Sequence, residues 1–256
     1  MKTKKSIFAV IIFLILSVFN VQSQTKITIV AAANIKVALD SIITVFKVQN
    51  PSEDIQVTYG ASGKLFEQIS NDAPFDIFFS ADMDYPTKLK EKKLTVSPVK
   101  LYAIGQLVIW SKKTDPNEKQ MNSLLDASIN KISIANPVTA PYGEKAVESM
   151  KYYKMYDKIQ SKLVYGENII QAAQFVTFGA ADIGITALSL ALSPAMIKEK
   201  GKYFIIPENS HTPLEQGCVI LKHAKENTIA LKFYDFISSE KAISILTYYG
   251  YTQKAK

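Results

Sequence analysis

Short apolar segments alternate with amphipathic segments along nearly the whole chain. The β-branched run KITIVAA (residues 26–32) precedes a stretch with apolar residues at helical spacing (residues 34–49). The same order returns later, where KISIAN (131–136) precedes the helix-like PYGEKAVESMKYY (141–153). Alternation of this kind predicts mainly parallel sheets with helices on both faces, and therefore an α/β fold.

Two longer extended runs interrupt this alternation. LYAIGQLVIW (101–110) and PLEQGCVILK (213–222) are not closely followed by a helix, and a block with its own strand–helix units lies between them. Two such strands are what a chain needs to cross into a second lobe and return. We therefore expect lobe 1 to comprise residues 24–104 and 214–256, and lobe 2 residues 105–213. One continuous doubly wound sheet is the alternative.

The N-terminus has the organisation of a secretory signal peptide. The basic MKTKK is followed by an apolar run of about 14 residues and then by small or polar residues up to Ser23. The run is shorter than the ~20 residues that a membrane-spanning helix needs. Residues 1–23 are therefore predicted to be cleaved and the mature chain to be exported, with an uncleaved anchor as the alternative.

The charge that remains is modest and scattered. Loss of Lys2, Lys4 and Lys5 with the signal peptide lowers the formal net charge from +7 to about +4. The remaining lysines alternate with acids and form no basic stripe with interleaved aromatic residues, so nucleic acid is not expected as a partner. The single cysteine, Cys218, lies within an apolar extended run, which favours a buried structural thiol.

The segment TYGASGKL (58–65) joins a predicted strand to a predicted helix through small residues. A nucleotide-binding loop needs G-x-x-x-x-G-K followed by Ser or Thr, whereas here Gly60 and Gly63 are three residues apart and Leu65 follows the lysine. Nucleoside triphosphate binding is therefore disfavoured. Free backbone N–H groups at a helix start suit a small anion, and Ser62 adds a hydroxyl donor. An N-cap serine in a tight turn is the alternative.

Three further turns have the same character. AAAN (31–34), NPVTAPYG (136–143) and GENI (166–169) each join a predicted strand to a predicted helix. Asn34 is suited either to cap its helix or to donate its side-chain amide. In open α/β sheets, turns at the carboxyl ends of strands gather where ligands bind. The four turns, two from each expected lobe, are therefore predicted to surround a small oxyanion with N–H groups.

No catalytic set accompanies these turns. The sequence has no Ser/His/Asp set with a nucleophile elbow, and His211 and His223 lie far from the turns and from each other. Asp76 and Asp82 in FDIFFSAD resemble a catalytic pair, but the start of a strand and the cap of a helix explain them better. We therefore expect neither an enzyme nor a metal-ligand cluster.

Five motifs in this order and spacing resemble the periplasmic molybdate-binding proteins of ABC transporters: ITIVAAANIKVAL, TYGASGKLFEQI, APFDIFFSAD, NPVTAPYGEKA and FGAADIGIT. The resemblance runs from about Lys26 to Tyr251. It implies a two-lobed type II periplasmic-binding-protein fold with two crossover strands and a periplasmic location. It also implies capture of molybdate or tungstate for delivery to a transmembrane permease. We expect a monomer with no cofactor.

The resemblance carries the family's anion-binding positions onto Asn34, Ser62, Tyr142 and Ile169, the last through its backbone N–H. The protein is expected to hold the oxyanion through its oxygens, with no direct ligand to the metal atom. Some family members have a tyrosine where this chain has Ala187. The hydroxyl of Tyr142 is a candidate replacement for it.

Molybdate suits a site made only of donors, because near neutral pH it is a dianion without a proton to donate. Phosphate often keeps a proton and would profit from an acceptor, whereas sulfate is rejected only through cavity size. Each charge-assisted hydrogen bond contributes about 1.5–3 kcal/mol. Another oxyanion as ligand, and an enzyme on the same scaffold, are the alternatives.

Overall fold

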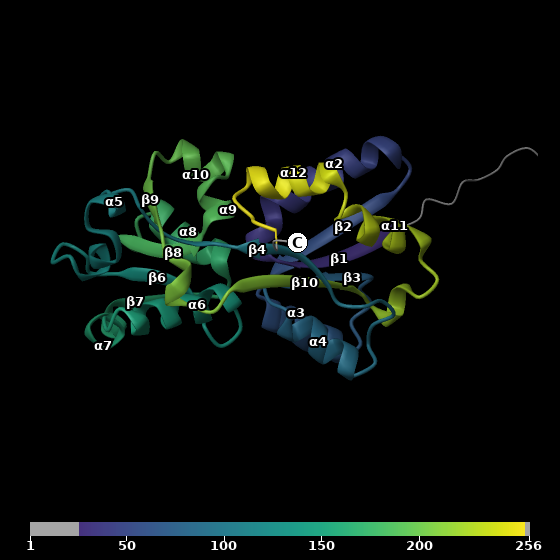
Figure 1. Ribbon diagram of the computed structural model, residues 1–256, viewed down its shortest axis with the longest axis horizontal. Coiled ribbons are helices and arrows are strands. Elements are labelled where there is room, and N and C mark those ends of the chain that lie inside the picture. Colours follow the sequence, from purple (N-terminus) through teal and green to yellow (C-terminus); the bar gives the residue numbers. More distant parts are fainter. Residues whose placement is uncertain (1–25, 254–256) are drawn as a thin grey trace, which may run out of the picture.

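The computed structural model describes residues 26–253. The predicted signal peptide, residues 1–23, and its cleavage site lie outside this range. The described chain forms two five-stranded sheets that lie side by side, each covered by helices (Figure 1). We refer to each sheet with its helices as a lobe. None of the helices between residues 26 and 253 has the length and apolar character needed to span a membrane.

The sheet of the first lobe has the strand order β2-β1-β3-β10-β4. β1 is parallel to β2 and β3, whereas β10 is antiparallel to both β3 and β4. All strands except β10 therefore run in the same direction. The strands are β1 Lys26–Ala32, β2 Asp54–Gly60, β3 Ile77–Phe79, β4 Lys100–Gly105 and β10 Leu214–Ile220.

The sheet of the second lobe repeats this design with the order β7-β6-β8-β5-β9. β6 is parallel to β7 and β8, and β5 is antiparallel to both β8 and β9. The prediction of mainly parallel sheets is confirmed, and the alternative of one continuous sheet is wrong. The strands are β5 Leu107–Ser111, β6 Ile132–Ala135, β7 Leu163–Gly166, β8 Ile183–Ala187 and β9 Lys202–Ile205.

Helices cover both faces of each sheet (Figure 1). In the first lobe, α2, α11 and α12 pack on one face and α3 and α4 on the other. In the second lobe, α8 and α6 lie over opposite faces. The helices are α2 Lys36–Gln49, α3 Ser62–Ser70, α4 Asp84–Glu91, α5 Pro116–Lys119, α6 Pro141–Tyr152, α7 Tyr156–Ile159, α8 Ile169–Thr177, α9 Leu188–Ala191, α10 Pro194–Lys198, α11 Thr228–Phe236 and α12 Glu240–Tyr248, with 3-10 turns η1 Ala33–Ile35, η2 Gln120–Leu125, η3 Gln160–Lys162, η4 Glu208–Ser210 and η5 Lys222–Ala224.

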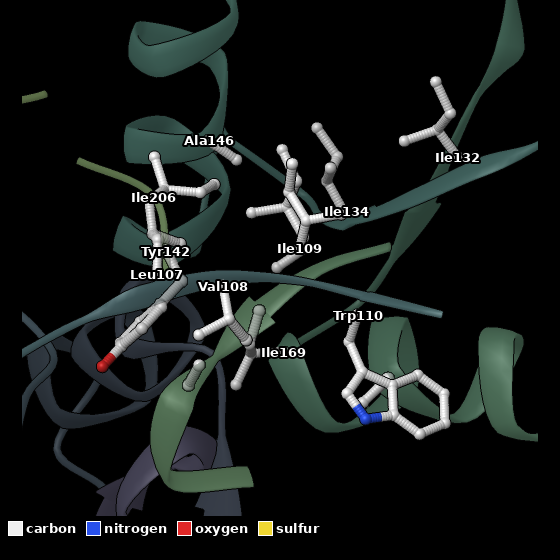
Figure 2. Packing of buried hydrophobic residues seen from close by; sticks show 14 of the residues in the cluster. Leu107, Val108, Ile109, Trp110, Ile132, Ile134, Tyr142, Ala146, Ile169 and Ile206 are labelled. Carbon is white, nitrogen blue, oxygen red and sulfur yellow. The ribbon is translucent and has the colours of Figure 1, made fainter. Parts of the chain in front are cut away.

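The core of the second lobe reaches the boundary between the lobes. Every residue of β5 is buried, and its aliphatic side chains pack with those of β6 and with Ala146 of α6 (Figure 2). Tyr142 and Ile169 belong to the same cluster. Figure 2 shows the Tyr142 ring at the edge of the cluster, with its hydroxyl oxygen directed away from the labelled isoleucines. The apolar ring is thus anchored in one lobe while its polar end is left for the boundary.

The chain crosses between the sheets where two extended runs were predicted. β4 of the first sheet ends at Gly105, and β5 of the second begins at Leu107 after the single residue Gln106. The return leads from β9 through η4 into β10, whose first residue, Leu214, packs in the core of the second lobe. The two connections lie side by side, because Leu214 pairs with Gly105.

Candidate functional site

In each lobe, the carboxyl ends of two adjacent strands are in register. Ala32, the last residue of β1, pairs with Gly60 of β2, and Ala135 of β6 pairs with Gly166 of β7. The turns that follow therefore leave each sheet beside one another. The turns of the first lobe lead into η1 with α2 and into α3, and those of the second lobe lead into α6 and α8. Two helical segments of each lobe therefore begin at the edge that faces the other lobe.

These helix starts enclose a small cavity between the lobes. Its volume is about 10 Å³, close to the roughly 10–15 Å³ that one water molecule needs. The space therefore limits an occupant to a solute of a few atoms. Asn34, Ser62, Tyr142 and Ile169, the residues predicted from the sequence, all line it. The other lining residues are mostly small: Ala32, Ala33, Gly60, Ala61, Ala81, Ala140 and Pro141.

The lining is uncharged but rich in donors. None of the residues that line the cavity is Lys, Arg, His, Asp or Glu. The first N–H groups of a helix have no partner within the helix, and the helix dipole adds partial positive charge at the same place. α3, α6 and α8 each contribute such an end. The site therefore attracts an anion without presenting a fixed positive side chain.

Ser62 is the first residue of α3 and is 1% exposed. The alternative that Ser62 caps α3 is wrong, because Ala61 occupies the N-cap and the serine side chain makes no capping bond. Instead, the Ser62 Oγ accepts the backbone N–H of Ala81 at 3.0 Å. A hydroxyl whose oxygen accepts from the protein keeps its proton for another partner. Ser62 is thereby oriented as a donor to an occupant of the cavity.

Tyr142 follows Pro141, the first residue of α6, and is 2% exposed. Its hydroxyl oxygen accepts a hydrogen bond from Gln216 Nε2 at 3.1 Å. Burial raises the pKa of the Tyr142 phenol well above its usual value and Tyr251 adds to this, whereas the hydrogen bond from the Gln216 amide acts in the opposite direction. The phenol is therefore protonated near neutral pH and available as a donor.

Asn34 lies in η1 and is 1% exposed. Of its two predicted side-chain roles, donation by the amide is seen, but to partners within the protein. It does not cap α2, whose N-cap is Ile35. Its Nδ2 donates to Gln216 Oε1 and to the Tyr251 hydroxyl, both at 2.9 Å, so both amide protons already have acceptors within the protein. The donor that Asn34 has left for an occupant is its backbone N–H.

Ile169 is the first residue of α8, and its side chain is buried in the core of the second lobe. Asn168 precedes it as N-cap and accepts the N–H groups of Ile170 and Gln171 at 3.0 and 3.1 Å. Those caps satisfy the second and third N–H groups of the helix but leave the first. Ile169 therefore has a backbone N–H that the cap leaves free, and its role toward an anion stays a prediction.

The two lobes touch around the cavity. The Gly63 N–H of α3 donates to the Thr139 carbonyl of the second lobe at 2.9 Å. From the other side, Ser189 Oγ donates to the Asn34 carbonyl at 2.8 Å. A Cβ at Gly63 would lie 2.6 Å from the Tyr85 hydroxyl oxygen of the same lobe and 3.0 Å from the same Thr139 oxygen, so the close approach of the lobes at this point requires a glycine. The structure is thus a closed arrangement.

The acidic residues that resembled a catalytic pair have structural partners. Asp76 accepts the N–H and the hydroxyl of Thr28 at 2.6 and 2.8 Å. Asp82 accepts the Tyr85 N–H in the first turn of α4 at 3.0 Å, although the N-cap position itself is Met83, and burial raises the pKa of Asp82. Within residues 26–253, no group of three or more His, Cys, Asp or Glu side chains is arranged to hold a metal ion.

Sequence reasoning missed the polar network behind the cavity. Its members are Gln216, Tyr102, Tyr251 and Ser189, all buried. A signal existed for Gln216, because a glutamine between Leu214 and Cys218 at alternate positions of an apolar strand indicates a buried amide that needs partners. The position of Tyr251 near the end of the chain gave no such signal.

Known proteins resemble this chain in sequence and in structure. The family described as bacterial extracellular solute-binding proteins matches residues 27–252. The molybdate-binding protein ModA of Azotobacter vinelandii is 34% identical over 227 residues, which cover 88% of this chain and 89% of that protein. ModA of Rhodobacter capsulatus is 34% identical over 199 residues, 77% of each chain. The solved periplasmic molybdate-binding protein of A. vinelandii superposes with a TM-score of 0.83 at 30% identity, covering 90% of this chain and 100% of that one. This likeness confirms the predicted two-lobed fold.

Proposed function

Because this chain belongs to the family of bacterial extracellular solute-binding proteins, we propose that it binds molybdate, or tungstate, between its two lobes. The relatives that are 34% identical are molybdate-binding proteins, which confirms the resemblance read from the five sequence motifs. One observation carries the proposal: four helical segments and two hydroxyl groups converge on one small, uncharged cavity.

The polarity of the hydroxyl groups supports a fully deprotonated oxyanion. Ser62 and Tyr142 both accept a hydrogen bond from the protein, so each has its proton left to donate. Backbone N–H groups at the starts of α3, α6 and α8 can only donate. An anion that keeps a proton would find no free acceptor among these groups. Molybdate, tungstate and sulfate fit this pattern, and hydrogen phosphate does not.

In our proposal, Asn34 and Ile169 bind the anion through backbone N–H groups, and Ser62 and Tyr142 bind it through their hydroxyls. Tyr142 takes the place of the tyrosine that some relatives have at the position of Ala187, which is buried and absent from the lining. Several charge-assisted bonds of about 1.5–3 kcal/mol each can hold a dianion without a counter-ion.

We further propose that the lobes, residues 24–104 with 214–256 and residues 105–213, open and close about the two connections near Gly105 and Leu214. Closure would bury the anion and present the loaded protein to the permease of an ABC transporter. Export through a cleaved signal peptide and action as a monomer without catalysis complete the proposal. The lining contains no nucleophile–base pair, which supports the non-catalytic role.

Isothermal titration calorimetry of the mature protein tests the proposal. Separate titrations with molybdate, tungstate, sulfate and phosphate should give tight binding of the first two, as in the molybdate-binding relatives, weaker binding of sulfate, and the weakest binding of phosphate. Binding of sulfate or phosphate more tightly than molybdate would move the protein to another oxyanion. Absence of heat with all four anions at micromolar protein would end the proposal.

A further inference from the structure

Gln216 joins the two lobes directly behind the cavity. It lies on β10 beside the crossing point, and its side chain is completely buried. Its Oε1 accepts from the Tyr102 hydroxyl at 2.8 Å and from Asn34 Nδ2 at 2.9 Å, both in the first lobe. Its Nε2 donates to the Tyr142 hydroxyl of the second lobe at 3.1 Å. One amide thus connects two residues of the first lobe to a cavity-lining residue of the second.

The bond from Asn34 determines which way the amide points, whereas the Tyr102 hydroxyl, which also lies 3.0 Å from the Ser80 carbonyl, could face either end of the amide. Reversing the Gln216 amide alone would place its NH₂ group against the NH₂ group of Asn34, two donors facing each other. The Asn34 amide is held in turn, because the Tyr251 hydroxyl directs its own proton to the Asn34 main-chain carbonyl at 3.0 Å and so accepts from Nδ2. Gln216 therefore presents an N–H, and not a carbonyl, to the oxygen of Tyr142.

This direction decides what the Tyr142 hydroxyl can do. A phenol hydroxyl can donate its proton or accept one through its oxygen. With the oxygen already accepting from Gln216, the remaining capacity of the hydroxyl is to donate. An unpaired tyrosine in the same place would be free to rotate and accept a proton from an anion such as hydrogen phosphate.

We infer that Gln216 is a positioning residue that sets anion specificity: its bond to Tyr142 holds the phenol proton toward the anion and excludes oxyanions that carry a proton. The inference rests on the proposed function and adds to it. The bond spans the two lobes and is part of the closed arrangement.

The packing around this bond leaves no room for another placement of the Tyr142 and Gln216 side chains. Gly105 lies beside the hydroxyl and the amide at the crossing between the sheets. A Cβ at this position would be 2.1 Å from the Tyr142 hydroxyl oxygen and 2.4 Å from Gln216 Nε2. The two groups therefore occupy space that only a glycine leaves open, which fixes their mutual placement.

A double-mutant cycle tests the inference, with Gln216→Met, Tyr142→Phe and the double variant titrated with molybdate and phosphate. Gln216→Met keeps the length of the side chain but cannot donate to the phenol. We expect about a tenfold weaker affinity for molybdate and a clearly smaller preference for molybdate over phosphate. Because Gln216 acts through the hydroxyl, the double variant should bind molybdate no more weakly than Tyr142→Phe does.

Gln253→Met is the matched control. Gln253 donates to the Tyr102 carbonyl at 3.2 Å and makes no bond to Tyr142, so its loss should leave the preference for molybdate over phosphate unchanged. Thermal unfolding without ligand separates folding defects from binding defects. Gln216→Asn, which keeps an amide of shorter reach, is the second variant if the methionine variant does not fold, and the same results are expected of it.

The outcomes separate the inference from the proposed function. If the wild-type protein binds molybdate but the two single substitutions weaken binding independently, their effects on the Kd multiply in the double variant. That result would overturn the role of Gln216 and leave the proposed function standing. An unchanged preference for molybdate over phosphate in the Gln216 variants would do the same. Failure of the wild-type protein to bind any of the tested oxyanions would overturn the proposed function and the inference together.

Discussion

Replacing Ser62 by alanine removes one hydroxyl donor from the cavity with the smallest possible change in shape. If the hydroxyl donates to a dianion, its loss costs about 1.5–3 kcal/mol of binding free energy, which raises the Kd for molybdate about 10- to 150-fold. The substitution also deprives the Ala81 N–H of its acceptor at 3.0 Å. That N–H is unpaired in both the free and the bound protein, so its penalty affects stability and cancels in the affinity.

The stability penalty has its own magnitude. Leaving a buried donor unpaired costs about 1–3 kcal/mol, and for a chain of this size each kcal/mol lowers Tm by about 2–4 °C. Calorimetric titration and thermal unfolding of the ligand-free protein therefore measure two separate effects. Ser133→Ala is the control. Its hydroxyl is fully buried in the second lobe and donates to the Ala172 carbonyl at 2.8 Å, away from the cavity. It should lower Tm and leave Kd within about twofold.

A Ser62→Ala protein with a lowered Tm and a Kd within about threefold of wild type would refute the reasoning. Such a result would mean that the hydroxyl serves only the Ala81 N–H. An equal loss of affinity in Ser62→Ala and Ser133→Ala would refute it in another way, because the affinity would then follow general stability rather than a contact with the anion.

Three further predictions follow from other parts of the structure. Ile169→Ala keeps the backbone donor, so the Kd for molybdate should change less than about threefold while chemical denaturation shows a loss of about 2–4 kcal/mol. Hydrogen bonding from Lys113 lowers the pKa of Asp182 to about 2. The substitution Asp182→Asn should therefore lower the free energy of unfolding by about 1–2 kcal/mol. This difference from wild type should be fully present above pH ~4 and disappear as the pH falls toward ~2. A loss that persists at pH ~2 would contradict it. Burial raises the pKa of Cys218 to about 12, so alkylation at pH 8 should be slow in the native protein and fast in denaturant.

The four turns were predictable because they are local features. Each follows an apolar strand, begins a helix and contains small residues, and these properties are read within about ten residues of sequence. Adjacent parallel strands then bring the turns together in pairs, as Ala32 beside Gly60 shows. The family resemblance supplied the correspondence between the pairs of the two lobes, which alternation alone does not give.

The direction of each hydrogen bond was not predictable, because it depends on partners far away in the chain. Ser62 is made a donor by a residue 19 positions away, Tyr142 by one 74 positions away, and the Asn34 amide is used by residues 182 and 217 positions away. A local sequence pattern identifies a hydroxyl or an amide but does not say whether its proton or its lone pair is free.

Whether an anion binds and which anion binds are therefore two separate questions at this site. Residue types at the turns are enough to predict that an anion binds, since any helix start offers N–H groups. Which anion binds depends on whether the hydroxyls donate or accept, and residues outside the lining decide this. A relative with the same lining but a carboxylate at the position of Gln216 would turn the Tyr142 proton away from the cavity. It would keep the fold and the turns while losing the donor, so specificity in such proteins has to be read from the layer behind the pocket as well as from its wall.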